Sequence, residues 1–148
     1  MRQCCEAGCR VFKDAYAQYG FTNSGTSNNP INIDELDNKA ETDLGYLGAN
    51  LKSAWDSNYV VWNTIKGLGI DSIFVGHEHA NSASVVYQGI RFQFGQKSST
   101  YDRANYVTDD GKIVCSYSEE GEPLVGGSVF SVSKTTGEIV NSYIYLCK

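Results

Sequence analysis

The sequence Ser72-Ile73-Phe74-Val75-Gly76-His77-Glu78-His79 contains both histidines of the chain. Its apolar run, Ile73 to Val75, predicts a short buried strand. Gly76 then allows a sharp turn, because glycine adopts backbone conformations that other residues avoid. In open α/β sheets, ligands bind beyond the carboxyl ends of the strands. The stretch therefore predicts a binding site at a strand end that contains two imidazoles.

The composition is that of a single globular domain spanning residues 1–148. Hydrophobic residues make up 41% of the chain and charged residues 20%, which argues against a disordered protein. The net charge of −5 argues against a nucleic-acid partner, because phosphate backbones are bound by clustered Lys and Arg. Since no apolar run is long enough to span a bilayer, we expect no membrane partner.

The cysteines favour a reducing compartment. An odd number of cysteines without a secretory signal is typical of free thiols, so a cytoplasmic location is the default expectation. The alternatives are a disulfide or a small zinc site that uses the N-terminal cysteines, of which Cys5 and Cys9 would share a helix face. The five cysteines are Cys4, Cys5, Cys9, Cys115 and Cys147.

Two helices are predicted before the central stretch. Residues 7 to 19 carry apolar side chains at helical spacing and are followed by Gly20, a common C-terminal residue. Residues 57 to 68 show the same spacing, and Ser57 is a suitable N-cap.

The segment between the predicted helices has a different composition. Residues 21 to 53 are polar and rich in acidic side chains, so we expect a loop or insertion with a solvated acidic surface. A calcium loop is not expected, because the carboxylates lack the required order and glycine.

After His79 the pattern predicts strands, so the chain is expected to be of the α/β (α+β) class, with two N-terminal helices followed by mixed or antiparallel strands. In the strand 90–94, alternation places Ile90, Phe92 and Phe94 on one face, opposite Arg91 and Gln93. The expected segments are strands 83–87 and 90–94 around a Gln88-Gly89 turn, a polar loop over 95–107, a strand at 113–117, and a hairpin of strands 127–132 and 138–146.

The spacing of His77 and His79 allows three interpretations. On a continuing strand, side chains at i and i+2 face the same way, so two imidazoles can converge on one metal or on two neighbouring metals. The alternatives are structural or solvated histidines, and histidines that act as acid or base. The chain has no G-x-S-x-G nucleophile motif.

The sequence resembles the calcineurin-like metallophosphoesterases, in particular their purple-acid-phosphatase-like branch. Gly76 to His79 is similar to the last metal-binding motif of that family, Gly-His-x-His after a buried strand. Asn81 and the strand that begins Gly89-Ile90-Arg91 resemble the features that follow the motif. Residues 126 to 130 resemble the closing hairpin, and residues 12 to 16 resemble the helix that precedes the motif.

The resemblance implies a hydrolase of phosphate esters with a dinuclear metal site of Fe, Mn or Zn, in which His77 binds one metal and His79 the other. Its fold would be the C-terminal half of the family's αββα sandwich. The substrate, a small phosphate ester, would be contacted by Asn81 and by the loop that carries Tyr101 and Arg103.

The chain departs from the family in its remaining ligands. The Asp-x-His and Gly-Asn-His motifs are absent, because the chain has no third histidine, and residues 1–10 differ from the family pattern. Two imidazoles cannot hold a dinuclear centre that takes roughly six or seven protein ligands. We therefore expect a fragment that is inactive alone and binds at most one metal weakly. The alternative is a non-catalytic half-domain that forms homo-oligomers, or pairs with a partner chain, through exposed sheet edges.

Overall fold

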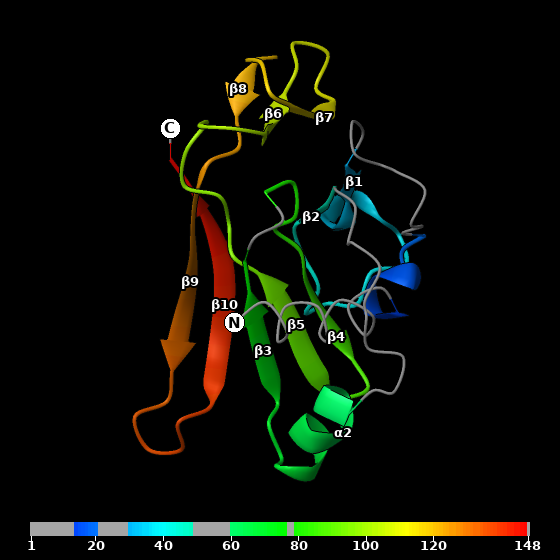
Figure 1. The fold of residues 1–148 in the computed structure, drawn as a ribbon, viewed down its shortest axis with the longest axis vertical. Coiled ribbons are helices and arrows are strands. Elements are labelled where there is room, and N and C mark those ends of the chain that lie inside the picture. Colours follow the sequence, from blue (N-terminus) through cyan, green and yellow to red (C-terminus); the bar gives the residue numbers. More distant parts are fainter. Residues whose placement is uncertain (1–13, 21–29, 49–59, 77–78, 148) are drawn as a thin grey trace.

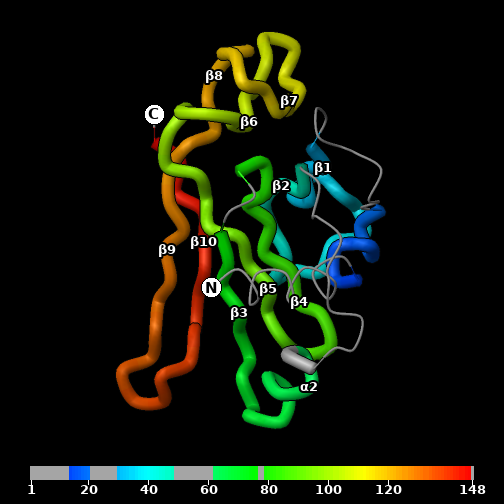
Figure 2. The backbone as a smooth tube through the Cα atoms, viewed as in Figure 1, coloured from blue at the N-terminus to red at the C-terminus, as the bar shows by residue number. Residues whose placement is uncertain are grey.

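The computed structural model describes residues 14–20, 30–48, 60–76 and 79–147 (Figures 1 and 2). These residues are mostly strand, in four small sheets with little helix, which is the mixed content of the α+β class. The elements are β1 (Ile31–Asn32), η1 (Ile33–Glu35), β2 (Tyr46–Leu47), α2 (Val60–Gly67), β3 (Ser72–Val75), β4 (Ser84–Tyr87), β5 (Ile90–Phe94), β6 (Ala104–Val107), β7 (Ile113–Ser116), β8 (Glu122–Pro123), β9 (Gly126–Val132) and β10 (Ile139–Leu146).

The central sheet has the strand order β3-β5-β4. The hairpin β4–β5 is antiparallel, as predicted, and its turn residues Gln88 and Gly89 have φ values of 49° and 79°. Two positive φ values are typical of a type I′ turn, whose twist matches that of the flanking strands. β3 pairs with β5 in parallel, with Val75 opposite Phe94.

One face of this sheet carries the hydrophobic core. Phe92 and Phe94 are buried there, as the alternation predicted. Between ring centroids, Phe92 lies 5.5 Å from Trp62 of α2, and Phe94 lies 6.1 Å from Tyr16. The core is therefore formed between the central sheet and two helical segments that lie before it in the sequence. Its other buried members are Ala15, Tyr19, Ile33, Leu47, Ala83, Val85 and Ile90.

The hairpin β9–β10 contacts the opposite face and lies beside β3 in Figure 1. The Ser142 hydroxyl donates to Gln93 Oε1 at 2.8 Å, and the ring of Phe130 lies 4.5 Å from that of Phe74. Gln93 is fully buried by this contact. The predicted closing hairpin is confirmed, and it gives the fold a third layer.

Ile73 to Val75 form a strand, as predicted, but the prediction that this strand is buried is wrong. Ile73 and Val75 are half-buried, and Phe74 is 43% exposed. The physical reason is that β3 is an edge strand, since within the described residues it pairs only with β5.

Residues 30–48, the described part of the predicted loop 21–53, are structured rather than solvated. β1 pairs with β2, Leu44 forms a bridge with Ser84, and Ile33 and Leu47 lie in the core. These apolar side chains give an otherwise polar segment one buried side. The prediction missed it because it was based on the overall composition of the segment.

Asp43 corrects the prediction of a solvated acidic surface. The other acidic side chains from residue 34 to 41 are exposed as predicted, but Asp43 is fully buried. Its carboxylate accepts hydrogen bonds from the Tyr19 hydroxyl at 2.5 Å, from the Thr42 hydroxyl at 3.1 Å and from the Val86 N–H at 2.9 Å. It thus joins the first helical segment, the 30–48 segment and β4.

A second correction concerns the predicted polar loop 95–107. Residues 104–107 form β6, which pairs with β7 and β8 in a separate sheet. Asn105 and Tyr106 are buried in this strand, so its mixed polar and apolar sequence reflects burial on both faces rather than a loop.

The two predicted helices are confirmed where the structure describes them. Residues 14–17 are helical and Gly20 has a φ of 79°, while α2 ends before Gly69, whose φ is 68°. Ser57, residues 7–13 and the cysteines Cys4, Cys5 and Cys9 lie outside the described residues. Cys115 and Cys147 are free, as expected. No helix among the described residues is long and apolar enough to cross a membrane.

The buried Asp43 carboxylate gives a stability prediction. Asp43→Ala should lower the free energy of unfolding by about 2–3 kcal/mol, because the Tyr19 hydroxyl and the Val86 N–H lose their acceptor away from water. Glu41→Ala, which removes an exposed carboxylate from the same segment, should change it by less than about 0.5 kcal/mol. Urea unfolding measures both variants, and equal effects would contradict the assigned role of Asp43.

The buried tyrosines predict a loss of stability at alkaline pH. Burial, with a contribution from the Asp43 carboxylate, raises the pKa of Tyr16 well above its usual value, and burial also raises the pKa values of Tyr19 and Tyr46. A phenol whose pKa is higher in the folded state keeps its proton there when the unfolded chain has lost it. The free energy of unfolding should therefore be constant up to about pH 9 and fall as the pH rises through about 10.

Tyr16→Phe should reduce this alkaline slope, measured as the urea midpoint between pH 8 and pH 11. Its effect at neutral pH should be small, because the Ala83 carbonyl that accepts the Tyr16 hydroxyl at 3.4 Å also accepts the Phe94 N–H at 3.0 Å. Tyr117→Phe, at a position 74% exposed, is the control. An unchanged slope in Tyr16→Phe would show that another group controls the transition.

Candidate functional site

The candidate site lies at the carboxyl edge of the central sheet. Because β3 and β5 are parallel, their carboxyl ends meet at one edge, and the Gly95 N–H donates to the Val75 carbonyl there at 2.9 Å. The segment from 76 to 83 joins β3 to β4, which lies on the far side of β5. Residues 79–83 lead into β4, and residues 95–103 leave β5 at the same edge. Side chains from these two segments meet.

His79 is the described histidine of this edge. Its Nδ1 lies 3.1 Å from Asp102 Oδ2 and 3.1 Å from Lys97 Nζ. His79 and Asp102 are each about two-fifths exposed, with side-chain values of 42% and 44%. The pair is thus open to solvent and accessible to a ligand.

The two contacts place opposite demands on one nitrogen. Asp102 needs a proton on Nδ1, whereas a lysine ammonium can only donate and needs a lone pair there. Lys97 Nζ has another acceptor, the Tyr101 carbonyl at 2.5 Å, while the nearby carboxylate attracts the ring proton. We therefore assign the Nδ1–H tautomer, which leaves the lone pair on Nε2, one of the two imidazole nitrogens that bind metals.

The backbone that follows His79 is closely packed against the 30–48 segment. Gly48 packs so closely that a Cβ there would lie 2.3 Å from the Ala80 carbonyl oxygen, so a larger residue would displace this segment. The Gly48 N–H also donates to Asn81 Oδ1 at 2.7 Å. A preorganised backbone of this kind lowers the entropy cost of presenting His79 to a ligand.

The other residues predicted for the site have separate environments. His77 lies outside the described residues. The side chain of Asn81 is buried and holds Gly48, and Tyr101 is 87% exposed. Arg103 Nε donates to Cys115 Sγ at 3.0 Å, and its guanidinium lies 6.0 Å from the centre of the Tyr117 ring. The Tyr101 carbonyl accepts a hydrogen bond from Lys97 Nζ.

The sequence did not point to Lys97 and Asp102. Both lie in a polar loop without a motif, and only the parallel pairing of β3 and β5 places them beside His79. Asp102 has a φ of 64°, a left-handed conformation that Asp adopts more readily than most residues. No sequence signal short of strand order would have identified the pair.

One described side chain at this edge, His79, could hold a metal ion, and one carboxylate, Asp102, could support it. The described residues contain no cluster of three His, Cys, Asp or Glu side chains that could hold an ion. The His79–Asp102 pair fits part of such a site. Histidines that bind metals usually donate their other ring N–H to a carboxylate, and in the assigned tautomer His79 donates to Asp102.

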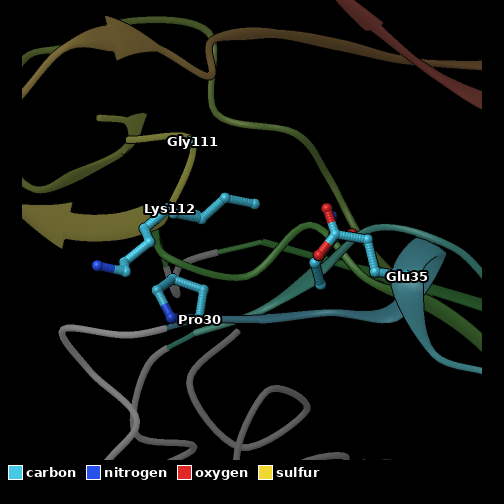
Figure 3. Close-up of a pocket in the computed structure, with 6 residues that line it drawn as sticks. Pro30, Glu35, Gly111 and Lys112 are labelled. Atoms are coloured by element: carbon cyan, nitrogen blue, oxygen red, sulfur yellow. The ribbon is translucent and has the colours of Figure 1, made fainter. Parts of the chain in front are cut away.

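A separate cavity of about 590 Å³ lies between η1 and the β6–β7 turn, away from the histidine (Figure 3). Lys112, at this turn, is bound to Asp110 in an exposed ion pair, which lowers the pKa of Asp110 to about 2. The cavity is lined by Pro30, Asn32, Glu35, Gly111, Lys112 and Ile113, none of which the sequence had indicated.

No protein-family model, curated protein or solved structure matches the chain. The function of this edge is therefore inferred from the residues themselves.

The assigned tautomer of His79 is testable by replacement of Asp102. In the wild-type chain the ring ¹⁵N shifts of His79 should indicate an Nδ1–H imidazole, measured near pH 8 by long-range ¹H–¹⁵N correlation. Asp102→Asn should shift the population towards the Nε2–H tautomer, because the amide no longer supplies a negative acceptor. Asp109→Asn, an exposed carboxylate in the β6–β7 turn, should leave the shifts unchanged. A wild-type Nε2–H tautomer would refute the assignment.

Proposed function

We propose that the chain contributes to a metal-dependent phosphoric ester hydrolase of the calcineurin-like metallophosphoesterase type, with His77 and His79 as metal ligands. The observation that carries the proposal is the His79–Asp102 pair at the carboxyl edge of β3 and β5. A histidine presented after a strand, with a carboxylate on Nδ1, has the arrangement expected of a metal ligand.

The role of the metal would be electrostatic. Bound Fe, Mn or Zn supplies Lewis-acid charge that polarises a phosphoryl oxygen. His79 would bind the ion through Nε2, and Asp102 would orient the ring and fix its tautomer. Since the chain has two histidines in all, it would bind one metal weakly by itself, and phosphoester hydrolysis would need ligands from a further segment or chain.

A second candidate is a non-catalytic half-domain that assembles with itself or with a partner chain. The favouring observation is that β9 and β10 contain no charged residue and, within the described part of the chain, pair only with each other. Strand edges without charge are suited to pairing with another chain. Exposed apolar side chains on this hairpin add to the surface: Val132, Val140, Tyr143 and Tyr145.

Metal loading tests the first proposal. The chain should bind at most about one Zn²⁺ or Mn²⁺, with Asp102→Asn weakening affinity by about tenfold through loss of ligand orientation, and His79→Ala or His77→Ala abolishing it. Equilibrium dialysis with metal analysis measures the binding, and Asp109→Asn is the matched control. A chromogenic phosphate ester should not be turned over.

The outcomes separate the two candidates. Metal binding that is unchanged in both histidine variants, or no binding at all, would refute the ligand assignment, and a dimeric mass by sedimentation would then favour the half-domain. Two bound metals with turnover would contradict the incompleteness of the site in this chain.

A further inference from the structure

The cavity between η1 and the β6–β7 turn is large enough for a small ligand. Its volume of about 590 Å³ lies within the range of known ligand sites, roughly 300–1,000 Å³. Pro30 and Ile113 line it with half-buried apolar side chains, and Glu35 adds an exposed carboxylate. The lining residues are all distinct from those at the histidine edge, so an inference about this cavity is independent of the proposed hydrolase.

Both walls of the cavity have a fixed backbone. On the side of η1, Ile33 is buried in the core and its N–H donates to the Gly45 carbonyl at 2.9 Å. In the β6–β7 turn, the Gly111 N–H donates to the Thr108 carbonyl at 2.8 Å. Walls that are already ordered lower the entropy cost of binding a ligand.

The positive charge of Lys112 is offset within its own turn. Its Nζ lies 2.5 Å from Asp110 Oδ2, and the Thr108 hydroxyl donates to the other carboxylate oxygen at 2.5 Å. Chiefly through the hydrogen bond from Lys112, the pKa of Asp110 is lowered to about 2, so this carboxyl group is ionised at neutral pH. Lys112 therefore gives the cavity little attraction for an anionic ligand.

Glu35 has the opposite situation. In Figure 3 its carboxylate points from η1 towards the wall that contains Gly111 and Lys112. Within the described part of the chain this carboxylate forms no hydrogen bond or ion pair. The sequence next to Pro30, residues 21–29, contains no Lys, Arg or His. The negative charge of Glu35 is thus available to a cation that enters the cavity.

We propose that this cavity binds a primary alkylammonium ligand, with the charged nitrogen at the Glu35 carboxylate and the hydrocarbon part against Pro30 and Ile113. An ammonium group has three donors and no acceptor, which suits a carboxylate. The apolar side chains add affinity through buried hydrocarbon surface, which a small inorganic cation lacks.

The test is a titration of the full chain with n-butylammonium chloride at pH 7 and low salt, followed by ¹H–¹⁵N NMR at Glu35, Gly111 and Ile113. n-Butylammonium should bind about fivefold more tightly than n-butanol, because the alcohol lacks the charge. It should also bind at least about threefold more tightly than methylammonium, which has less hydrocarbon to bury.

Two variants separate the site from general attraction to an acidic surface. Glu35→Gln keeps the shape of the side chain and should weaken n-butylammonium binding by about fivefold, to the level of n-butanol. Asp37→Asn removes an exposed carboxylate from the same segment and should change the affinity by less than about twofold. Equal affinity for the amine and the alcohol, an unchanged affinity in Glu35→Gln, or equal losses in the two variants would each overturn the inference.

Discussion

The parallel pairing of β3 with β5 is the constraint on which the candidate site depends. β4 and β5 form a local hairpin, but β5 lies between β4 and β3. The connection from β3 to β4 must therefore pass over the carboxyl end of β5, and it carries His79. The chain leaving β5 continues into the loop with Lys97 and Asp102. Their contact with His79 follows from strand order, since these residues are 18 and 23 positions away from it in sequence.

Buried polar groups also stabilise this arrangement. Asp43 binds Tyr19 and the Val86 N–H, and Asn81 binds the Gly48 N–H. Both side chains connect the 30–48 segment to the chain around β4. A buried carboxylate or amide is costly to leave unpaired, so these contacts specify one alignment of the two segments. The backbone that follows His79 is therefore positioned by the 30–48 segment as well as by the central sheet.

The sequence could predict features that depend on residues close to one another in the chain. The Gln88-Gly89 turn needs positive φ at two neighbouring residues, and the strands beside it alternate, so that hairpin was predictable. The position of His79 after a strand was also predictable. The burial of Asp43 and the strand β6 were not, because each depends on a distant partner. In the sequence, Asp43 cannot be distinguished from the exposed acidic residues near it. Ala104 to Val107 lack the alternation of a strand because both faces are covered.

The two contacts of His79 Nδ1, with Asp102 and with Lys97, are reconciled by a backbone carbonyl. If Lys97 had no other acceptor, its ammonium would compete for the Nδ1 lone pair, and the ring proton would move to Nε2. The Tyr101 carbonyl supplies that acceptor, so Asp102 can keep the proton on Nδ1. Lys97 then contributes positive charge without taking a lone pair from the ring. The tautomer of His79 thus depends on one backbone carbonyl that lies within reach of the lysine.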